Sequence, residues 1–178
     1  IYVETNNVAE YIAYTKTLNK MNIQSTTQED SLIFVTAELQ YMMQNYEQAA
    51  AGLATYLTRF CPGGRYCVNA MHYAANSYYM LEQYEQAKEQ YMELTKIDGN
   101  PYMEKACMRV AEISYDQKDY PTALTYFERM YAAASDQNMA QTALLGMMRC
   151  SHYINNNDAS IKHATSMLAL EDLSNAIY

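Results

Sequence analysis

The residues best equipped for chemistry in this sequence are its four cysteines and three histidines. Cys61 and Cys67 flank the segment Pro-Gly-Gly-Arg-Tyr, and His72 follows a few residues later. These three side chains could together hold zinc, but a structural zinc site needs a fourth ligand that is missing here. His152 and His163 do not stand at metal-ligand spacing on one helix. We therefore expect no metal and no cofactor.

The same two cysteines could also be joined to each other, because a disulfide across their short turn is geometrically feasible. The interpretation that we favour is two independent thiols at adjacent helix ends, with the Cys61–Cys67 disulfide as the alternative. Cys107 and Cys150 fall inside helical patterns, where a free cysteine usually behaves as a small apolar residue.

No catalytic arrangement emerges from the remaining residues. Pro62-Gly63-Gly64 lacks the lysine and the spacing of a phosphate-binding loop. A cysteine nucleophile would need a base and an orienting group, and the sequence gives no sign of that pairing. Acidic pairs such as Glu82 and Glu85 are more simply a solvated helix face. We therefore expect that the chain is not an enzyme.

The composition favours helices and excludes several classes of protein. The chain has 178 residues, 50% of them hydrophobic, which excludes wholesale disorder. It has only five glycines and three prolines, too few for the turns of an all-β fold, while tyrosine numbers 19. The net charge of −8 argues against binding to nucleic acid, which requires a clustered basic face. No apolar run approaches the roughly 20 residues that span a bilayer, so we expect no membrane insertion by this segment.

An internal repeat in the sequence predicts the secondary-structure elements that position these residues. Three segments align clearly and a fourth more weakly, and the last aligned column is Ala49, Ala87, Ala123 and Ser160. The spacings between successive members of this column are 38, 36 and 37 residues. Twelve residues before each column member stands Ala37, Ala75, Ala111 or Met148. A constant interior with variable joints predicts a repeated helical hairpin.

Each unit has two amphipathic stripes, so we predict an all-α protein with four hairpins at about 27–62, 66–100, 102–137 and 139–170. Residues 1–26 are interpreted as the tail helix of a preceding repeat plus a linker, and residues 171–178 as the start of a further helix. The segment therefore reads as part of a longer protein. Thr26 and Glu29 have the spacing of a capping box that would open the first hairpin.

The pattern resembles the tetratricopeptide repeat, a right-handed α-solenoid of helix-turn-helix units. The second unit carries the resemblance best, through Ala75, Tyr78, Tyr84, Ala87, Tyr91 and Leu94. The departures are a period of 36–38 residues and the loss of the family's usual tryptophan, replaced by Ile33, Met71, Cys107 and Leu144. The linker from Phe60 to Tyr66 is most similar to bacterial cell-envelope members, including the Tol–Pal-associated periplasmic type and the outer-membrane-assembly lipoprotein type.

The resemblance implies that the first helices line a concave groove for a partner. One aligned position then places a ring in each repeat: Tyr41, Tyr79, Tyr115 and His152. We call these four residues the ring column. The position three residues before it gives Glu38, Asn76, Glu112 and Arg149, and an earlier position gives Phe34, His72, Met108 and Leu145. If the ring column faces a partner, its rings are not required by the core of each hairpin. The alternative interpretation is that the rings pack against neighbouring first helices and face no partner.

The function that follows from the resemblance is a non-enzymatic protein–protein interaction scaffold in a periplasmic or cell-envelope protein, with a protein or peptide partner in the groove. Two alternatives stay open. The segment could be architectural or self-associating, or it could be a helical regulatory cap on a catalytic or sensor domain elsewhere in the protein. A cytoplasmic location is the alternative to the envelope.

Overall fold

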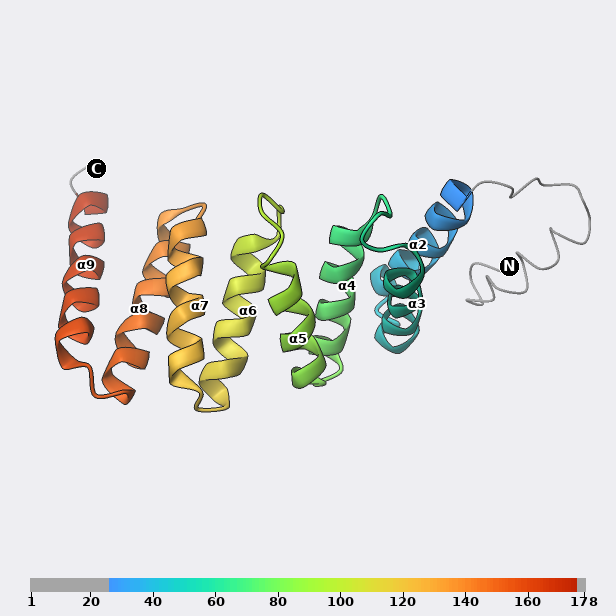
Figure 1. Ribbon diagram of the computed structural model, residues 1–178. Helices are drawn as coiled ribbons and strands as arrows, with labels where there is room; N and C mark the ends of the chain where they lie inside the picture. Colours follow the sequence, from blue (N-terminus) through green and yellow to red (C-terminus); the bar gives the residue numbers. More distant parts are fainter. Residues whose placement is uncertain (1–25, 176–178) are drawn as a thin grey trace, which may run out of the picture. The chain divides into compact units, whose positions relative to one another are not determined.

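The computed structural model describes the backbone of residues 26–175 and the side chains of residues 29–170 (Figure 1). The expected tail helix and linker before residue 26 lie outside these residues, as does the side chain of Thr26. The described part contains eight α-helices and no strand, which confirms the all-α prediction. The helices are α2 (Thr26–Met42), α3 (Tyr46–Phe60), α4 (Cys67–Met80), α5 (Tyr84–Leu94), α6 (Met103–Asp116), α7 (Tyr120–Ala133), α8 (Gln137–Tyr153) and α9 (Asn157–Asn175).

The chain divides into two compact units, Ile1–Gln90 and Tyr91–Tyr178, and the division falls within α5. Unit 1 contains α2, α3, α4 and the first part of α5, and unit 2 contains the rest of α5 and α6 to α9. Two helices fall in each predicted hairpin segment. Helix α9 runs without a break through Asn175, so residues 171–175 continue that helix, and the prediction that a further helix starts at 171 is wrong there.

Small residues are buried where the two helices of a hairpin approach each other. Ala37, Ala75 and Ala111 on the first helices are at most 1% exposed, and Ala49, Ala87 and Ala123 on the second helices are fully buried. In the fourth hairpin the Ser160 hydroxyl donates a hydrogen bond to the carbonyl of Met148 at 3.1 Å. The two alignment columns are therefore the packing positions of the hairpins.

All four hairpin turns have the same backbone conformation. A residue with positive φ follows each first helix, with φ between 59° and 63°: Gln44, Glu82, Lys118 and Asn155. Its N–H donates to the carbonyl three residues back, and the next N–H donates to the carbonyl five residues back. This is a Schellman-type helix end, which usually has glycine at the left-handed position. In this chain the residue with positive φ is never glycine, and all four side chains are exposed.

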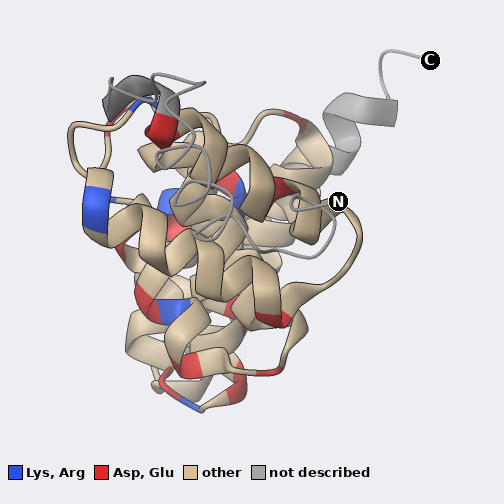
Figure 2. Cartoon of the chain, turned by 90° about the vertical axis from the view of Figure 1, so that its right-hand side faces the viewer, with Lys and Arg blue, Asp and Glu red and all other residues tan. Residues whose placement is uncertain are grey.

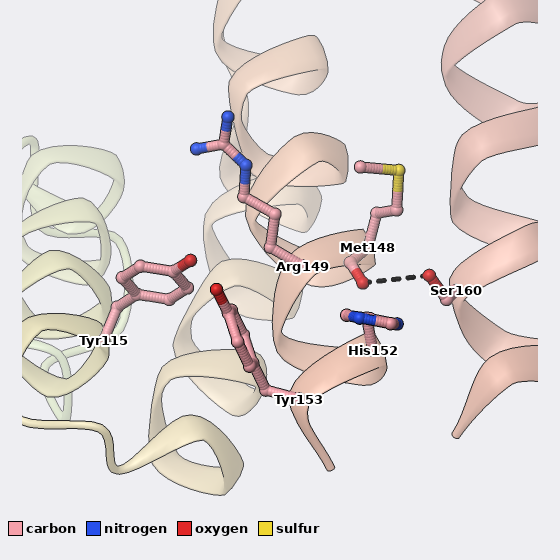
Figure 3. Close-up of a pocket in the computed structure, with 6 residues that line it drawn as sticks. All are labelled: Tyr115, Met148, Arg149, His152, Tyr153 and Ser160. Atoms are coloured by element: carbon pink, nitrogen blue, oxygen red, sulfur yellow. Dashed lines mark hydrogen bonds between the residues drawn. The ribbon is translucent and has the colours of Figure 1, made fainter. Parts of the chain in front are cut away.

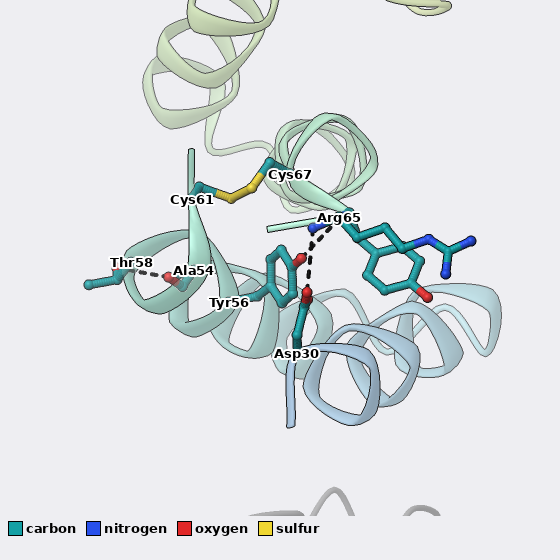
Figure 4. Close-up of a disulfide and its surroundings, with 8 residues drawn as sticks. Asp30, Ala54, Tyr56, Thr58, Cys61, Arg65 and Cys67 are labelled. Atoms are coloured by element: carbon teal, nitrogen blue, oxygen red, sulfur yellow. Dashed lines mark hydrogen bonds between the residues drawn. A yellow bond between two sulfur atoms is a disulfide. The ribbon is translucent and has the colours of Figure 1, made fainter. Parts of the chain in front are cut away.

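The joint between α3 and α4 contains the disulfide (Figure 4). Cys61 and Cys67 are bonded to each other, with Cα atoms 5.6 Å apart, so the favoured reading of two independent thiols does not describe this joint. Within the loop, the Tyr66 N–H donates to the hydroxyl of the fully buried Tyr56 at 3.0 Å, and the Arg65 N–H donates to Asp30 Oδ2 at 3.4 Å. The loop is thus attached to both α2 and α3.

The other two joints are held by different side chains. Between α5 and α6, the buried Asn100 donates to the carbonyls of Leu94 and Ile97 at 3.0 and 2.7 Å. Arg129 of α7 donates to the carbonyl of Thr95 at 2.6 Å and so caps the end of α5. Between α7 and α8, Asp136 Oδ1 accepts from the N–H of Met139 at 2.9 Å and begins α8.

Candidate functional site

The tyrosines of the ring column pack against the second helix of their own hairpins. Three of its rings lie edge-to-face against the first residue of the following helix, with centroids 5.5 to 5.8 Å apart and planes 66° to 71° apart. The pairs are Tyr41 with Tyr46, Tyr79 with Tyr84, and Tyr115 with Tyr120. These rings thus make contacts within their own hairpins that the sequence did not predict. The three column tyrosines are half-buried, so each still presents part of its ring to solvent.

In unit 1 the column also joins neighbouring first helices. The side-chain amide of Asn76 on α4 donates a hydrogen bond to the hydroxyl of Tyr41 on α2. The ring of Tyr73 lies against that of Tyr41, with centroids 4.8 Å apart. Asn76 is only 8% exposed. Two predicted binding positions, Tyr41 and Asn76, thus contact each other across α2 and α4.

The other candidate residues in unit 1 differ in how much of each side chain is exposed to solvent. His72 is 5% exposed and its ring lies against that of Tyr73, at a centroid distance of 5.4 Å. Glu38 is half-buried on α2. Tyr79 keeps part of its ring in solvent beside the exposed ring of Tyr84. The accessible surface of the predicted site in unit 1 is therefore supplied mainly by tyrosine rings.

In unit 2 the predicted residues meet around a hollow (Figure 3). Tyr153, the last residue of α8, stacks on Tyr120 with centroids 4.4 Å apart and lies edge-on to Tyr115 at 6.0 Å. Beside these rings is a hollow of about 380 Å³, lined by Tyr115, Met148, Arg149, His152, Tyr153 and Ser160. Three predicted residues, Tyr115, Arg149 and His152, are brought together here. We call this feature the α6–α8 hollow.

The polar groups of the α6–α8 hollow are mostly hydrogen-bond donors. Figure 3 shows the hydroxyls of Tyr115 and Tyr153 pointing toward one another, with the Arg149 side chain extending above them. Burial raises the pKa of Tyr115, and the neighbouring Tyr153 hydroxyl raises this pKa further, while Arg149 acts in the opposite direction. Arg149 is exposed, and no acidic side chain within residues 29–170 forms an ion pair with it.

Glu112, also predicted to face the partner, is engaged with its own helix. Its Oε2 atom lies 2.8 Å from Arg109 Nη1, one turn earlier on α6. Since this ion pair neutralises Glu112 locally, the charge offered by the predicted positions of unit 2 is that of Arg149. Over the rest of the described chain, acidic positions spread across several helices and turns, with fewer basic positions between them (Figure 2).

Sequence reasoning missed Tyr153 as a site residue. The alignment assigned the fourth column position to His152, and Tyr153 stands one residue later, at the end of α8. The sequence did contain a signal. The second helix of the fourth repeat begins with Asn157, where the other three repeats have tyrosine, and Tyr153 is an aromatic residue close to that position. Its ring stacks on Tyr120 of the preceding hairpin.

The cysteines and histidines do not form a metal site in the described part of the chain. There, no group of three or more His, Cys, Asp or Glu side chains could hold a metal ion. Cys61 and Cys67 are bonded to each other, so they are not available as thiolate ligands beside His72. Cys107 and Cys150 are free and fully buried, and burial raises the pKa of Cys150 to about 11. Their thiolates are therefore disfavoured.

None of the described helices is both long enough and apolar enough to cross a bilayer.

Comparison with known proteins identifies the fold. No family profile and no curated protein sequence matches the chain. Among solved structures, MamA superposes with a TM-score of 0.65 at 9% identity, over 98% of this chain and 96% of MamA. TPR-like repeats of a Podosopora anserina protein named as a kinesin light chain superpose with a TM-score of 0.62 at 11% identity, over 97% and 91% of the two chains. PilF of Pseudomonas aeruginosa superposes with a TM-score of 0.59 at 16% identity, over 83% of this chain and 64% of PilF.

These superpositions, all at low sequence identity, show that the chain has the fold of a tetratricopeptide-like helical-repeat solenoid. The predicted fold class is thereby confirmed.

Proposed function

We propose that this chain is a non-enzymatic protein–protein interaction scaffold whose first helices bind an extended peptide or a helix of a partner. The observation that carries the proposal is the α6–α8 hollow, where Tyr115, Arg149 and His152 converge from two successive first helices. Flat rings with a polar edge bind partners at low entropic cost, and such residues are enriched among those that dominate binding energy. The repeat fold supports the proposal, since it presents many first helices side by side.

We further propose that the parent protein is a bacterial cell-envelope protein. The Cys61–Cys67 disulfide supports this location, because disulfides persist in oxidising compartments such as the periplasm and are rare in the cytosol. The similarity of the Phe60–Tyr66 linker to that of envelope repeat proteins points in the same direction.

A photo-crosslinking experiment tests the binding role. A benzoylphenylalanine placed at His152, at the rim of the α6–α8 hollow, should form a covalent adduct with the partner in cells. The control position is Thr125, an exposed residue of the second helix α7. An adduct at His152 that is absent at Thr125 is the expected result. Equal labelling at both positions, or none at His152, would contradict the proposal.

Self-association is a second candidate, favoured by the outer face of α9. Ile161 and Leu168, two turns apart on that helix, are 65% and 57% exposed. Apolar side chains at this spacing form a stripe that another helix could cover. If they mediate association, an Ile161→Glu, Leu168→Glu double variant should sediment as a smaller species than the unchanged chain at the same concentration. Identical sedimentation would exclude this face as an interface.

A further inference from the structure

We propose that the α6–α8 hollow is an oxyanion subsite that takes the carboxylate of a glutamate or aspartate side chain from an acidic partner peptide. The inference rests on the proposed binding function and specifies the chemistry of the partner. It also reverses the expectation from net charge, because a chain of charge −8 would bind basic partners if its overall charge governed the choice.

The lining of the hollow carries the argument. None of its six residues is acidic, and five of them carry a hydrogen-bond donor. The Ser160 hydroxyl already donates to the Met148 carbonyl, which leaves the donors of Tyr115, Arg149, His152 and Tyr153. The Tyr115 and Tyr153 rings lie edge-on with centroids 6.0 Å apart, and their hydroxyls point toward one another, so both hydroxyls are presented at the same place. The guanidinium of Arg149 offers up to five more donors and pairs well with carboxylates. A donor-rich, acid-free hollow is complementary to an oxyanion.

The accessibility of Arg149 makes it the anchor of this subsite. It is exposed and forms no ion pair with the acidic residues of the described chain, whereas Arg109 on the neighbouring first helix is occupied by Glu112 at 2.8 Å. Arg129 in the same unit is occupied too, by the carbonyl and hydroxyl of Thr95. Arg149 is therefore the guanidinium of α6 to α8 that a ligand can reach without breaking an existing interaction.

The rings and the volume indicate what accompanies the carboxylate. About 380 Å³ exceeds what a carboxylate needs, and the exposed ring of Tyr153 (52%) borders the space. Aromatic faces favour apolar or aromatic neighbours. We therefore expect an acidic residue flanked by an apolar one. Acidic residues elsewhere on the chain would repel a second negative charge on the peptide. The single acidic residue of the peptide would therefore bind at Arg149, which fixes the register of the peptide.

The probe is a pair of blocked peptides, Ac-Gly-Phe-Glu-Phe-Gly-NH₂ and its glutamine twin, titrated into the full 178-residue chain and followed by NMR at the Nε–H of Arg149. The glutamate peptide should shift this signal and bind about tenfold more tightly than its twin, because a charge-assisted hydrogen bond is lost with glutamine. Arg149→Gln should abolish that tenfold difference. Lys162→Gln, which removes an exposed positive charge outside the hollow, should preserve it.

Two further probes separate the sources of the oxyanion. A glutamine peptide with a free C-terminus tests a terminal carboxylate, and inorganic phosphate tests a bare anion. Preference for either over the blocked glutamate peptide would overturn the assignment to an acidic side chain. Equal binding of the glutamate and glutamine peptides, loss of the difference in Lys162→Gln, or no binding of any peptide would overturn the subsite. The crosslinking result at His152 in cells is independent of these peptides, so the scaffold role could stand if the subsite fails.

Discussion

The ring of Tyr79 lies edge-to-face against the ring of Tyr84, with centroids 5.6 Å apart and planes at 71°. Tyr79 ends the first helix of its hairpin and Tyr84 begins the second, so the pair closes the hairpin at its turn. The same pair recurs in the hairpins on either side, with nearly the same geometry. A residue chosen from the repeat as a binding position is therefore also a structural one, and tests of binding must keep its ring.

Tyr79→Ala should lower the free energy of unfolding by about 2 kcal/mol, because it removes a half-buried ring and its edge-to-face partner. Tyr79→Phe keeps the ring and should cost less than about 1 kcal/mol. Urea unfolding followed by circular dichroism measures both values. Equal losses for the two variants would show that the hydroxyl, and not the ring pair, stabilises the turn.

Glycine at the left-handed turn positions should stabilise the chain. Glu82→Gly and Lys118→Gly relieve a positive φ that is unfavourable for a residue with a Cβ, and each should raise the free energy of unfolding by up to about 1 kcal/mol. Asn155→Gly should gain less, since asparagine tolerates this conformation. Thermal melts of the three variants test the order, and an equal or larger gain at Asn155 would contradict it.

Ala87→Leu should destabilise the second hairpin by about 1–3 kcal/mol, because Ala87 is fully buried and a larger side chain would overpack the helix contact. The matched control is Gln86→Leu on the adjacent, exposed position, which should change stability by less than about 0.5 kcal/mol. Denaturant unfolding compares the pair. Similar losses at both positions would mean that the repeat register is misassigned.

Reduction of the Cys61–Cys67 disulfide should lower stability by about 2 kcal/mol, the loop-closure contribution of a cross-link that spans a sequence separation of six residues. Melting with and without a reductant measures the effect. A Cys61→Ser, Cys67→Ser variant serves as the control, since its melting should not respond to reductant. The buried Cys107 and Cys150 remain in that variant, so a response there would have to come from them.

Stability should fall at high pH through Tyr56. Burial, with a smaller contribution from its hydrogen bond with Asp30, raises the pKa of Tyr56 from 10.0 to about 12. The folded state therefore holds the phenol proton more tightly than the unfolded state. This stabilisation is complete below pH 10 and is lost as the pH rises from about 10 to about 12. Tyr56→Phe should unfold with a shallower dependence on pH over this window; an identical dependence would contradict the shift.

The constant spacing of twelve residues was enough to predict the hairpins, because it reports a contact between two helices that every repeat must make. Ala75 and Ala87 are both fully buried as this contact requires. The joints could not be predicted in the same way, since each one uses different chemistry. The Tyr66 N–H donates to the hydroxyl of Tyr56, whereas the aligned residues Leu94 and Met130 have no hydroxyl to accept such a bond.

The sequence predicted some of the residues of the candidate site but not the contacts that these residues make. Alignment placed Tyr115, Arg149 and His152 on equivalent faces, and these residues do line one hollow. Alignment could not reveal that Asn76 is occupied by the hydroxyl of Tyr41, because that contact depends on how two first helices meet. It also gave no weight to Tyr153, whose role depends on stacking against a ring in the preceding hairpin.

The four turns share one backbone shape while their left-handed position holds glutamine, glutamate, lysine and asparagine, all exposed. The conformation is therefore specified by the hydrogen bonds of the helix end and leaves the side chain free to change. These turns are regularly spaced attachment points at which a dye, a spin label or a tether could be introduced, one per repeat, without altering the buried alanines or the ring column.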